Sequence, residues 1–419
     1  MKHTTAVATD ETGMRRAPQK RRGLARGVAI AIAAVAQLAT AAALAGPNEQ
    51  AARMFQRLTG VPPDDATLAS MSTDITQGNA LGAAYTAMQN DNFYSVVLKN
   101  YAMPWTNVAQ TQFAPLNDYV ATVIGMVRDD VPFNTVLSAD IIYIGASNLG
   151  LPAYSNTDDN HYTQLELSGA KLGNPAVLVQ SKQSTVTGLP AAATAGVLTS
   201  RAAGQAFFSL GTNRRMFRFT MINFFCGDMP NFMDTTRPTD RIRQDVSRSP
   251  GGDSQLFFNN CVGCHSGMDP MAQAFAHYDF TTPINPSTNA PDPTNGQLTY
   301  TPTTIAPKYF HNNLTFPDGF ITPDDSWSNR WRTGQNSLIG WDPTLTGSGT
   351  GMKSLGVELE STTQFAQCQV QQVFQTVCLR PPSTAADYAQ VTTMTGDFKS
   401  GGYKLKQVFA EAAVYCMGN

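Results

Sequence analysis

The sequence predicts a mainly α-helical protein, and three observations support this fold class. Apolar side chains recur every three or four positions in residues 116–130, 370–377 and 405–416, which is the spacing of a helix that buries one face. The one short extended run expected, near residues 136–145, is bordered by turn-forming residues. The remaining stretches are rich in Gly, Pro, Asn and Thr, which favours loops over an extensive sheet.

The N-terminal segment predicts export. Residues 1–26 carry seven basic and two acidic side chains, and residues 27–45 are apolar apart from Gln37 and Thr40. The segment ends in Ala43-Leu44-Ala45, a small-x-small cleavage pattern. We expect residues 1–45 to be a signal peptide, with an uncleaved membrane anchor as the alternative. The predicted location is therefore the periplasm or the extracellular space.

The charge of the remaining chain argues against nucleic acid as a partner. Without residues 1–45, the sequence holds 22 basic and 29 acidic residues, a net charge of about −7. No basic patch stands out along this part of the chain. Since nucleic-acid binding depends on clustered Lys and Arg, we expect no nucleic-acid partner.

Residues 46–245 are expected to form a helical N-terminal domain. Helices are predicted at 48–60, 80–102 and 116–130, followed by a loop-like stretch over 146–195. Two more helices are expected within 196–230, where Phe217, Met221, Phe224 and Phe225 share one face.

The central motif is Cys261-x-x-Cys264-His265. A thioredoxin-like redox pair needs a βαβ setting, which the sequence does not suggest. A zinc site needs a second Cys/His pair at metal spacing, and His277 and His311 stand alone. Covalent attachment of haem c fits best, because Cys261 and Cys264 can form thioethers and His265 can be the proximal iron ligand. One motif predicts one haem.

The distal iron ligand is predicted less directly. The candidates are two histidines and five methionines, namely His277, His311, Met268, Met271, Met352, Met394 and Met417. Met352 follows a Gly-rich loop well downstream of the motif, a position from which backbone can approach a haem face. We expect Met352 as the distal ligand, with core filling or an open sixth position as alternatives.

Two regions are expected after residue 245. Residues 246–360 are predicted as the haem domain, with a long loop-rich insertion at about 280–350 that contains Trp327, Trp331 and Trp341. The insertion is too long for a simple connection and is expected either to cover the haem, to form a partner surface, or to pack only on itself. Residues 361–419 are predicted as a C-terminal helical domain.

Four further cysteines, Cys226, Cys368, Cys378 and Cys416, predict two disulfides in an exported chain. Cys368 and Cys378 lie on one predicted helix, about 15 Å apart along its axis, which is too far for a bond. Two connectivities remain if that helix is unbroken. We favour Cys368–Cys416 together with Cys226–Cys378.

Four stretches of the chain resemble the exported planctomycete-type cytochrome c proteins. They are residues 117–143, residues 195–230, the motif "CVGCHSGMDPMAQAFAHYDF" and the helix "FAQCQVQQVFQTVCLRPP". The resemblance spans about 112–416 and implies haem attachment through Cys261, Cys264 and His265. It also implies a structural turn at Asp269-Pro270. The sequence departs from the family pattern at Met271, where a Gly is common, and at Leu379, which precedes Arg380 in place of a Gly.

Together these observations predict a cytochrome c-like haem domain behind a helical domain, in an exported monohaem protein that exchanges single electrons with a redox partner protein. The alternatives are a haem enzyme of the peroxidase or oxidase kind with an open sixth position, and a structural haem subunit of a larger membrane or cell-surface complex.

Overall fold

A computed structural model describes residues 45–209 and 211–418, so the expected signal segment lies outside the described residues except for Ala45. The described chain is mainly helical, as the sequence predicts. Its α-helices are α2 (Pro47–Thr59), α3 (Asp65–Thr76), α4 (Ala80–Ala87), α5 (Lys99–Ala102), α6 (Asp118–Arg128), α7 (Asn160–Leu167), α8 (Gln183–Thr187), α9 (Arg201–Phe207), α10 (Arg214–Phe225), α11 (Ser254–Asn260), α12 (Val262–Ala272), α13 (Gly351–Glu360), α14 (Thr363–Cys378), α15 (Ala385–Ser400) and α16 (Leu405–Cys416). None of the helices in the described ranges is both long enough and apolar enough to cross a bilayer.

Short strands form four two-stranded antiparallel sheets in the described chain. The strands are β1 (Ile142–Gly145), β2 (Leu178–Ser181), β3 (Tyr278–Thr281), β4 (Ile284–Asn285), β5 (Ala290–Pro291), β6 (Gln297–Tyr300), β7 (Ser326–Ser328) and β8 (Ser348–Thr350). They pair as β1 with β2, β3 with β6, β4 with β5, and β7 with β8.

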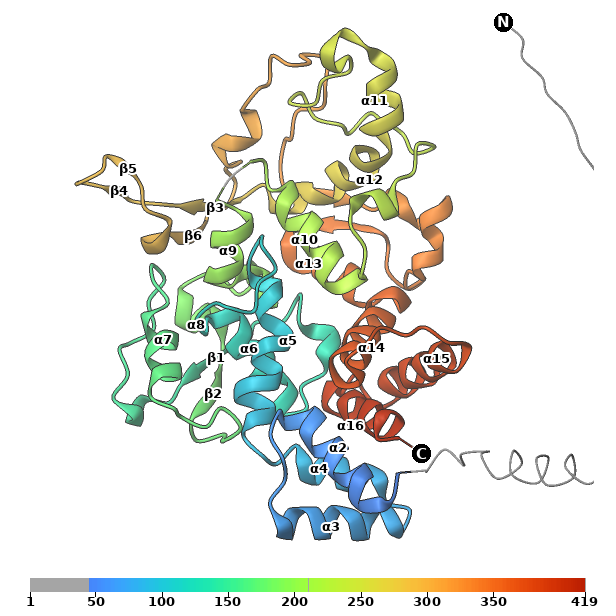
Figure 1. Ribbon diagram of the computed structural model, residues 1–419. Helices are drawn as coiled ribbons and strands as arrows, with labels where there is room; N and C mark the ends of the chain where they lie inside the picture. The colour runs from blue at the N-terminus through green and yellow to red at the C-terminus, as the bar shows by residue number, and fades with distance from the viewer. Residues whose placement is uncertain (1–44, 210, 419) are drawn as a thin grey trace, which may run out of the picture. The chain divides into compact units, whose positions relative to one another are not determined.

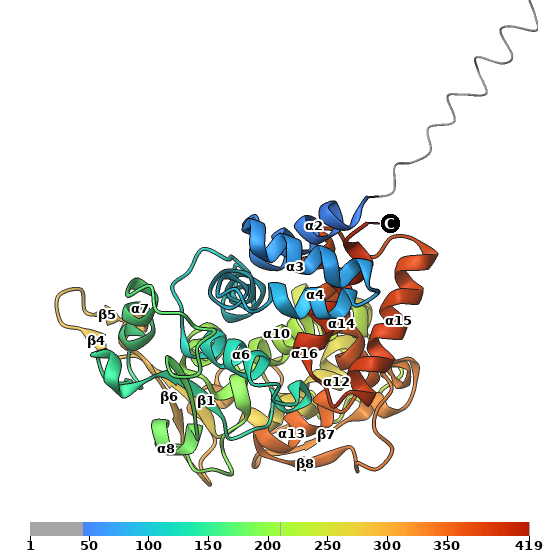
Figure 2. The same ribbon diagram turned by 90° about the horizontal axis from the view of Figure 1, so that it is seen from below.

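The first and last helices of the described chain lie side by side. In Figures 1 and 2, α2 and α4 lie beside α14 and α16, and contacts join α16 to both α2 and α4. Side-chain caps fix where several of these helices begin. The Asp64 carboxylate accepts from the Thr67 N–H at the start of α3, and Thr384 and Asp387 form a capping box on α15.

Helix α6 is the most deeply buried element, since every one of its residues is shielded from solvent. At its start, the Asp118 carboxylate accepts from the backbone N–H groups of Arg201 and Ala202 at 2.5 and 3.1 Å. At its end, the Arg128 guanidinium donates to the Leu178 carbonyl at the start of β2. These bonds hold α9 and the β1–β2 ribbon against the central helix.

One hydrophobic core runs through all three regions that the sequence predicts as domains. It contains Met54 from α2, Ile124 from α6, Met271 from α12 and Phe365 from α14. Residues from 46 onward form one compact unit. The domain boundaries expected near residues 245 and 360 therefore stay predictions.

Most predicted helices are confirmed, with two corrections. The helix expected at 80–102 is interrupted, because a turn at 88–91 separates α4 from a π-helix at Phe93–Leu98 and then α5. The polar sequence Gln89-Asn-Asp-Asn92 explains the break, since Asn and Asp side chains favour turns. The stretch 146–195, expected as loop, contains α7, β2 and α8.

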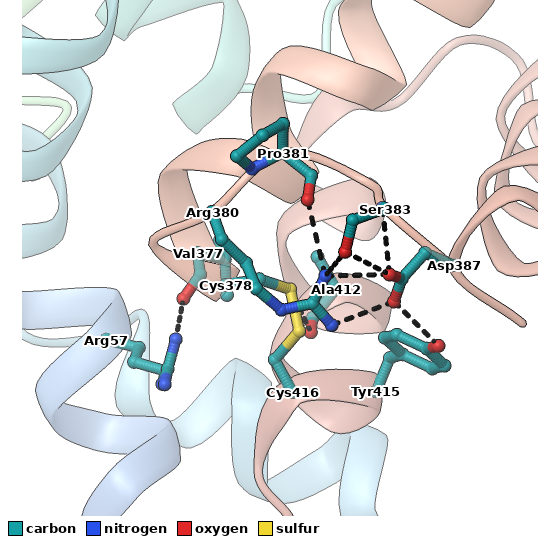
Figure 3. The surroundings of a disulfide bond; sticks show 10 residues. All are labelled: Arg57, Val377, Cys378, Arg380, Pro381, Ser383, Asp387, Ala412, Tyr415 and Cys416. Carbon is teal, nitrogen blue, oxygen red and sulfur yellow. Dashed lines mark hydrogen bonds and ion pairs between the residues drawn. A yellow bond between two sulfur atoms is a disulfide. The ribbon is translucent and has the colours of Figure 1, made fainter. Parts of the chain in front are cut away.

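The disulfide pairing that the sequence favoured is wrong. The structure pairs Cys226 with Cys368 and Cys378 with Cys416. Figure 3 shows the second of these bonds. Helix α14 is unbroken from 363 to 378, so Cys368 and Cys378 are too far apart along it to pair, as expected. Each of the two cysteines meets a different helix. α10 reaches the N-terminal part of α14, and α16 reaches its C-terminal end, which spacing along the sequence does not reveal.

The insertion at 280–350 contains more regular structure than expected. It holds five of the eight strands in full, part of β3, and several short 3-10 turns. Its three tryptophans differ in their surroundings. Trp331 is fully buried against Gly267 of α12, and Trp327 is also buried, whereas Trp341 is half-buried.

Candidate functional site

The Cys-x-x-Cys-His motif lies where two helices join, at the end of the molecule occupied by α11 and α12 (Figure 1). Helix α11 starts from an Asp253 cap and ends at Asn260, and α12 begins at Val262. Cys261 sits at the junction, and its carbonyl accepts from the His265 N–H at 3.1 Å. The helical turn between Cys261 and His265 places both thiols and the imidazole on neighbouring positions of the helix surface.

Both motif cysteines carry free thiols, although the other four cysteines are paired. The Cys261 sulfur is exposed beside the Leu256 carbonyl. The Cys264 sulfur lies 3.6 Å from the Met229 carbonyl, and burial raises the pKa of its thiol. The two sulfurs are therefore presented separately, as two single thioether links require.

The His265 imidazole is fixed by a buried carboxylate. Its Nδ1 lies 3.1 Å from Oδ1 of Asp269, one helical turn further along α12. The Asp269 side chain is fully shielded from solvent, while His265 is about one-fifth exposed. No other described residue forms a hydrogen bond with the ring, so Nε2 is the nitrogen available to a ligand. Hydrogen positions follow from this geometry: the ionised Asp269 accepts, and Nδ1 donates.

Arg214, the first residue of α10, holds Asp269 in place. Its guanidinium binds both oxygens of Asp269 at 2.6 and 2.8 Å and both oxygens of Asp245 at 2.6 and 2.8 Å. Burial by itself raises the pKa of Asp269, but Arg214 and then His265 outweigh it, and the pKa lies well below its usual value. Asp269 is therefore an anion inside the protein, paired on one side with Arg214 and on the other with the imidazole.

The expected turn at Asp269-Pro270 is wrong, because both residues lie inside α12. Pro270 has no N–H, so the helical bond to the Ser266 carbonyl is absent. The helix nevertheless continues to Ala272. What the sequence motif encodes is the carboxylate four residues after His265, on the same helix face.

Apolar side chains surround the motif. Cys261 packs on a small cluster that includes Phe257 and Val262. On the outer face of α11, Leu256 and Phe258 are 42% and 54% exposed. A hollow of about 480 Å³ borders α11, lined chiefly by aromatic side chains of α11 and of the insertion and by the Arg248 guanidinium, namely Phe257, Phe258, Phe316, Phe320 and Arg248. Neither the motif cysteines nor His265 line this hollow.

The insertion is joined to this region by its backbone. The Phe316 and Phe320 N–H groups donate to the Gln244 and Ile242 carbonyls. The Arg248 guanidinium lies 4.9 Å from the Phe257 ring centre and 4.5 Å from that of Phe316. Part of the insertion thus lies against the segment before the motif. The alternative that the insertion packs only on itself is therefore excluded.

Met352, the expected distal ligand, is completely buried in the large core. Its helix, α13, packs on the 3-10 turns Gln273–Phe275 and Phe133–Thr135, on strands β7 and β8, and on α14. Core filling explains this position fully. Its role as an iron ligand stays a prediction.

The donor set fits a covalently attached haem. It provides two unpaired thiols, an adjacent imidazole with one nitrogen already engaged, and apolar side chains next to the outer thiol. Among the described residues, no group of three or more His, Cys, Asp and Glu is arranged to hold a metal ion by itself. In this arrangement iron would be held by His265 and the porphyrin, rather than by a cage of protein ligands.

Sequence reasoning missed the contact between Asp269 and His265, and with it Arg214 and Asp245. One signal was present in the sequence, since His265 and Asp269 are four residues apart, the spacing of neighbours on a helix. Arg214 and Asp245 are brought to the site only by the tertiary fold.

Comparison with protein-family models, with curated proteins and with solved structures finds no match for this chain. The resemblance to planctomycete-type cytochrome c proteins therefore stays a prediction.

Proposed function

We propose that this protein is an exported monohaem c-type cytochrome that transfers single electrons to or from a partner redox protein. Cys261 and Cys264 tether the porphyrin, and His265 is the proximal ligand through Nε2. The observation that carries the proposal is the pair of free thiols beside an imidazole whose Nδ1 is already bonded to Asp269. When bound, haem supplies a one-electron couple at its iron.

The protein's own contribution is to orient and polarise the proximal ligand. Asp269 holds Nδ1 protonated and fixes the ring, and Arg214 keeps Asp269 ionised and immobile. A hydrogen bond from a histidine ligand to a carboxylate raises the basicity of the ligand. An anion near the iron favours the more positive, oxidised state, so we infer a low reduction potential.

The surroundings suit a carrier that docks and undocks. A cytochrome c-like arrangement is proposed for α11, α12 and the adjoining part of the insertion, where the exposed Leu256 and Phe258 would offer apolar contacts to a tethered porphyrin. The cofactor cannot dissociate during encounters with a partner. The two disulfides are compatible with the oxidising compartments outside the cytoplasm.

The test is covalent haem content in a host that matures c-type cytochromes. The secreted wild-type protein is expected to gain the mass of one haem and to give a haemochrome spectrum with pyridine. The double variant Cys261→Ser, Cys264→Ser should be secreted without haem. The control His311→Ala changes an exposed histidine outside the motif and should keep the haem. A bare polypeptide mass for the wild-type protein overturns the proposal.

A haem enzyme with an open sixth position is the second candidate. The hydrogen bond between His265 and Asp269 favours it, because a strongly basic proximal ligand stabilises oxidised iron, which peroxide chemistry requires. The visible spectrum separates the two functions. Low-spin iron that does not bind cyanide supports the carrier, whereas high-spin iron that binds cyanide rapidly supports the enzyme.

A further inference from the structure

A second site lies in a groove of about 1040 Å³, more than twice the volume of the hollow beside α11. Its walls come from α2, the π-helix and α5, α10, and the end of α14. None of the haem-motif residues lines it. The groove is therefore separate from the proposed haem site.

Three arginines and no acidic residue line the groove. Arg53 and Arg57 lie four residues apart on one face of α2, and the third, Arg380, follows α14. Like charges at this spacing repel each other and destabilise a helix. Within the described chain neither Arg53 nor Arg57 forms an ion pair, and each donates only to a backbone carbonyl, that of Met417 and that of Val377.

Arg380 is held rigidly at the edge of the groove. Its guanidinium binds both oxygens of Asp387, which also accepts from the Tyr415 hydroxyl (Figure 3). The same view shows Arg57 reaching the Val377 carbonyl at the end of α14, next to Cys378. Burial, and then the charges of Arg53 and Arg380, lower the pKa of Arg57, so the three cations share one electrostatic environment. The Cys378–Cys416 bond fixes the end of α14 that carries this wall.

The remaining lining is rich in free amides. Five of the lining amide side chains form no hydrogen bond with another described residue: Gln56, Asn100, Gln110, Gln112 and Gln375. The floor includes Tyr101 and Trp105, which are mostly buried and pack edge to face. Amides match hydroxyl groups, and guanidinium groups match carboxylates.

We propose that this groove binds a hydroxyl-rich carboxylate, such as a short oligomer of a uronic acid, with its carboxylates on Arg53 and Arg57. The volume suits a ligand larger than one sugar unit. The absence of acidic lining residues excludes a preference for cations. Uncharged sugars satisfy the amides but leave the two arginines without an anion, so they should bind more weakly.

Calorimetric titration tests the proposal with trigalacturonic acid as probe and maltotriose as its neutral counterpart. The acidic trisaccharide is expected to bind, with an affinity that falls as salt is added, and maltotriose to bind at least about tenfold more weakly. Arg57→Gln and Arg53→Gln should each weaken binding by about ten- to a hundredfold, the usual worth of a hydrogen bond to a charged group. The control Arg237→Gln removes a cation that does not line the groove and should leave the affinity unchanged.

Three outcomes overturn the proposal: no heat with trigalacturonic acid, equal affinity for maltotriose, or unchanged affinity in both Arg57→Gln and Arg53→Gln. If Arg57→Gln unfolds because its bond to Val377 is lost, Arg53→Gln decides the result alone. Haem content, measured on the same samples, is expected to stay constant. A wild-type protein that binds trigalacturonic acid but carries no haem would contradict the proposed electron-transfer function and leave the groove proposal standing.

Discussion

If the proposed haem is bound, replacing Asp269 by Asn should raise its reduction potential without removing it. Asn keeps the size of the side chain and still offers an oxygen to Nδ1 of His265, but it removes the negative charge. One imidazole ring would separate this charge from an iron bound at Nε2 of His265, which we take as roughly 7 Å for a Coulomb estimate. At an effective dielectric constant of about 20, two unit charges at that separation interact by ~2.4 kcal/mol. For one electron this corresponds to about 100 mV, at ~59 mV for each factor of ten.

Redox titration followed by visible spectroscopy measures this shift. Asp245→Asn is the matched control, because Asp245 binds the other side of Arg214 and does not contact His265. Removing that charge should shift the potential by less than half as much. The reasoning is refuted if Asp269→Asn leaves the potential unchanged, or if both variants shift it equally. Both variants disturb a buried ion pair, and a loss of roughly 3–5 kcal/mol in stability is expected for each.

Three further predictions concern stability and ligation. The pKa of buried Glu360 is raised to about 8, mainly by burial, from an ordinary value of 4.5. Between these two pKa values the Glu360 carboxyl keeps its proton in the folded protein but loses it in the unfolded chain. The free energy of unfolding should therefore fall as the pH rises from about 4.5 to about 8, by up to ~5 kcal/mol. Urea unfolding at about pH 5 and pH 8 should show a flatter dependence in Glu360→Gln. Replacing both Cys378 and Cys416 by Ser removes a cross-link between residues that are 38 positions apart in the sequence. Because the unfolded chain then gains conformational entropy, the free energy of unfolding should fall by about 4 kcal/mol. The midpoint of urea unfolding under non-reducing conditions measures this loss. Met352→Ala is expected to convert low-spin to high-spin haem with the covalent haem retained. An unchanged spectrum would identify Met352 as a core residue only, whose loss costs ~2–5 kcal/mol.

The predictable part of this fold is its local part. The apolar residues within 116–130 lie on α6, and those near the C-terminus lie on α14 and α16. These helices were predictable because a helix that buries one face carries apolar residues at every third or fourth position. Helix α15 was missed for the converse reason. Its apolar residues do not gather into one continuous stripe, and its start is fixed by a Thr384–Asp387 capping box, a weaker signal.

The disulfides and the site show where local reasoning stops. Helix geometry correctly excluded a bond between Cys368 and Cys378, but the choice between the two remaining pairings depends on which helix meets each end of α14. In the same way, the sequence placed two thiols and an imidazole together, since they share one turn. The partner of Asp269, Arg214, lies 55 residues before it in the sequence, and the second carboxylate on Arg214, that of Asp245, lies 24 residues before Asp269. Those contacts follow from tertiary packing alone.

The Arg214–Asp269 pair also joins two stretches of the chain that lie far apart in the sequence. Asn213 precedes α10 with a left-handed backbone, and its amide donates to the Phe275 and Tyr278 carbonyls at 3.0 Å each. The next residue, Arg214, then meets Asp269 on α12. Residues 195–230 and 261–280 are therefore joined through two adjacent residues, Asn213 and Arg214. Because Asn213 fixes the start of α10, Asn213→Ala should shift the potential of the proposed haem in the same direction as Asp269→Asn, although Asn213 contacts neither His265 nor Asp269. An unchanged potential in a folded Asn213→Ala protein would show that Asn213 does not influence His265 through Arg214 and Asp269.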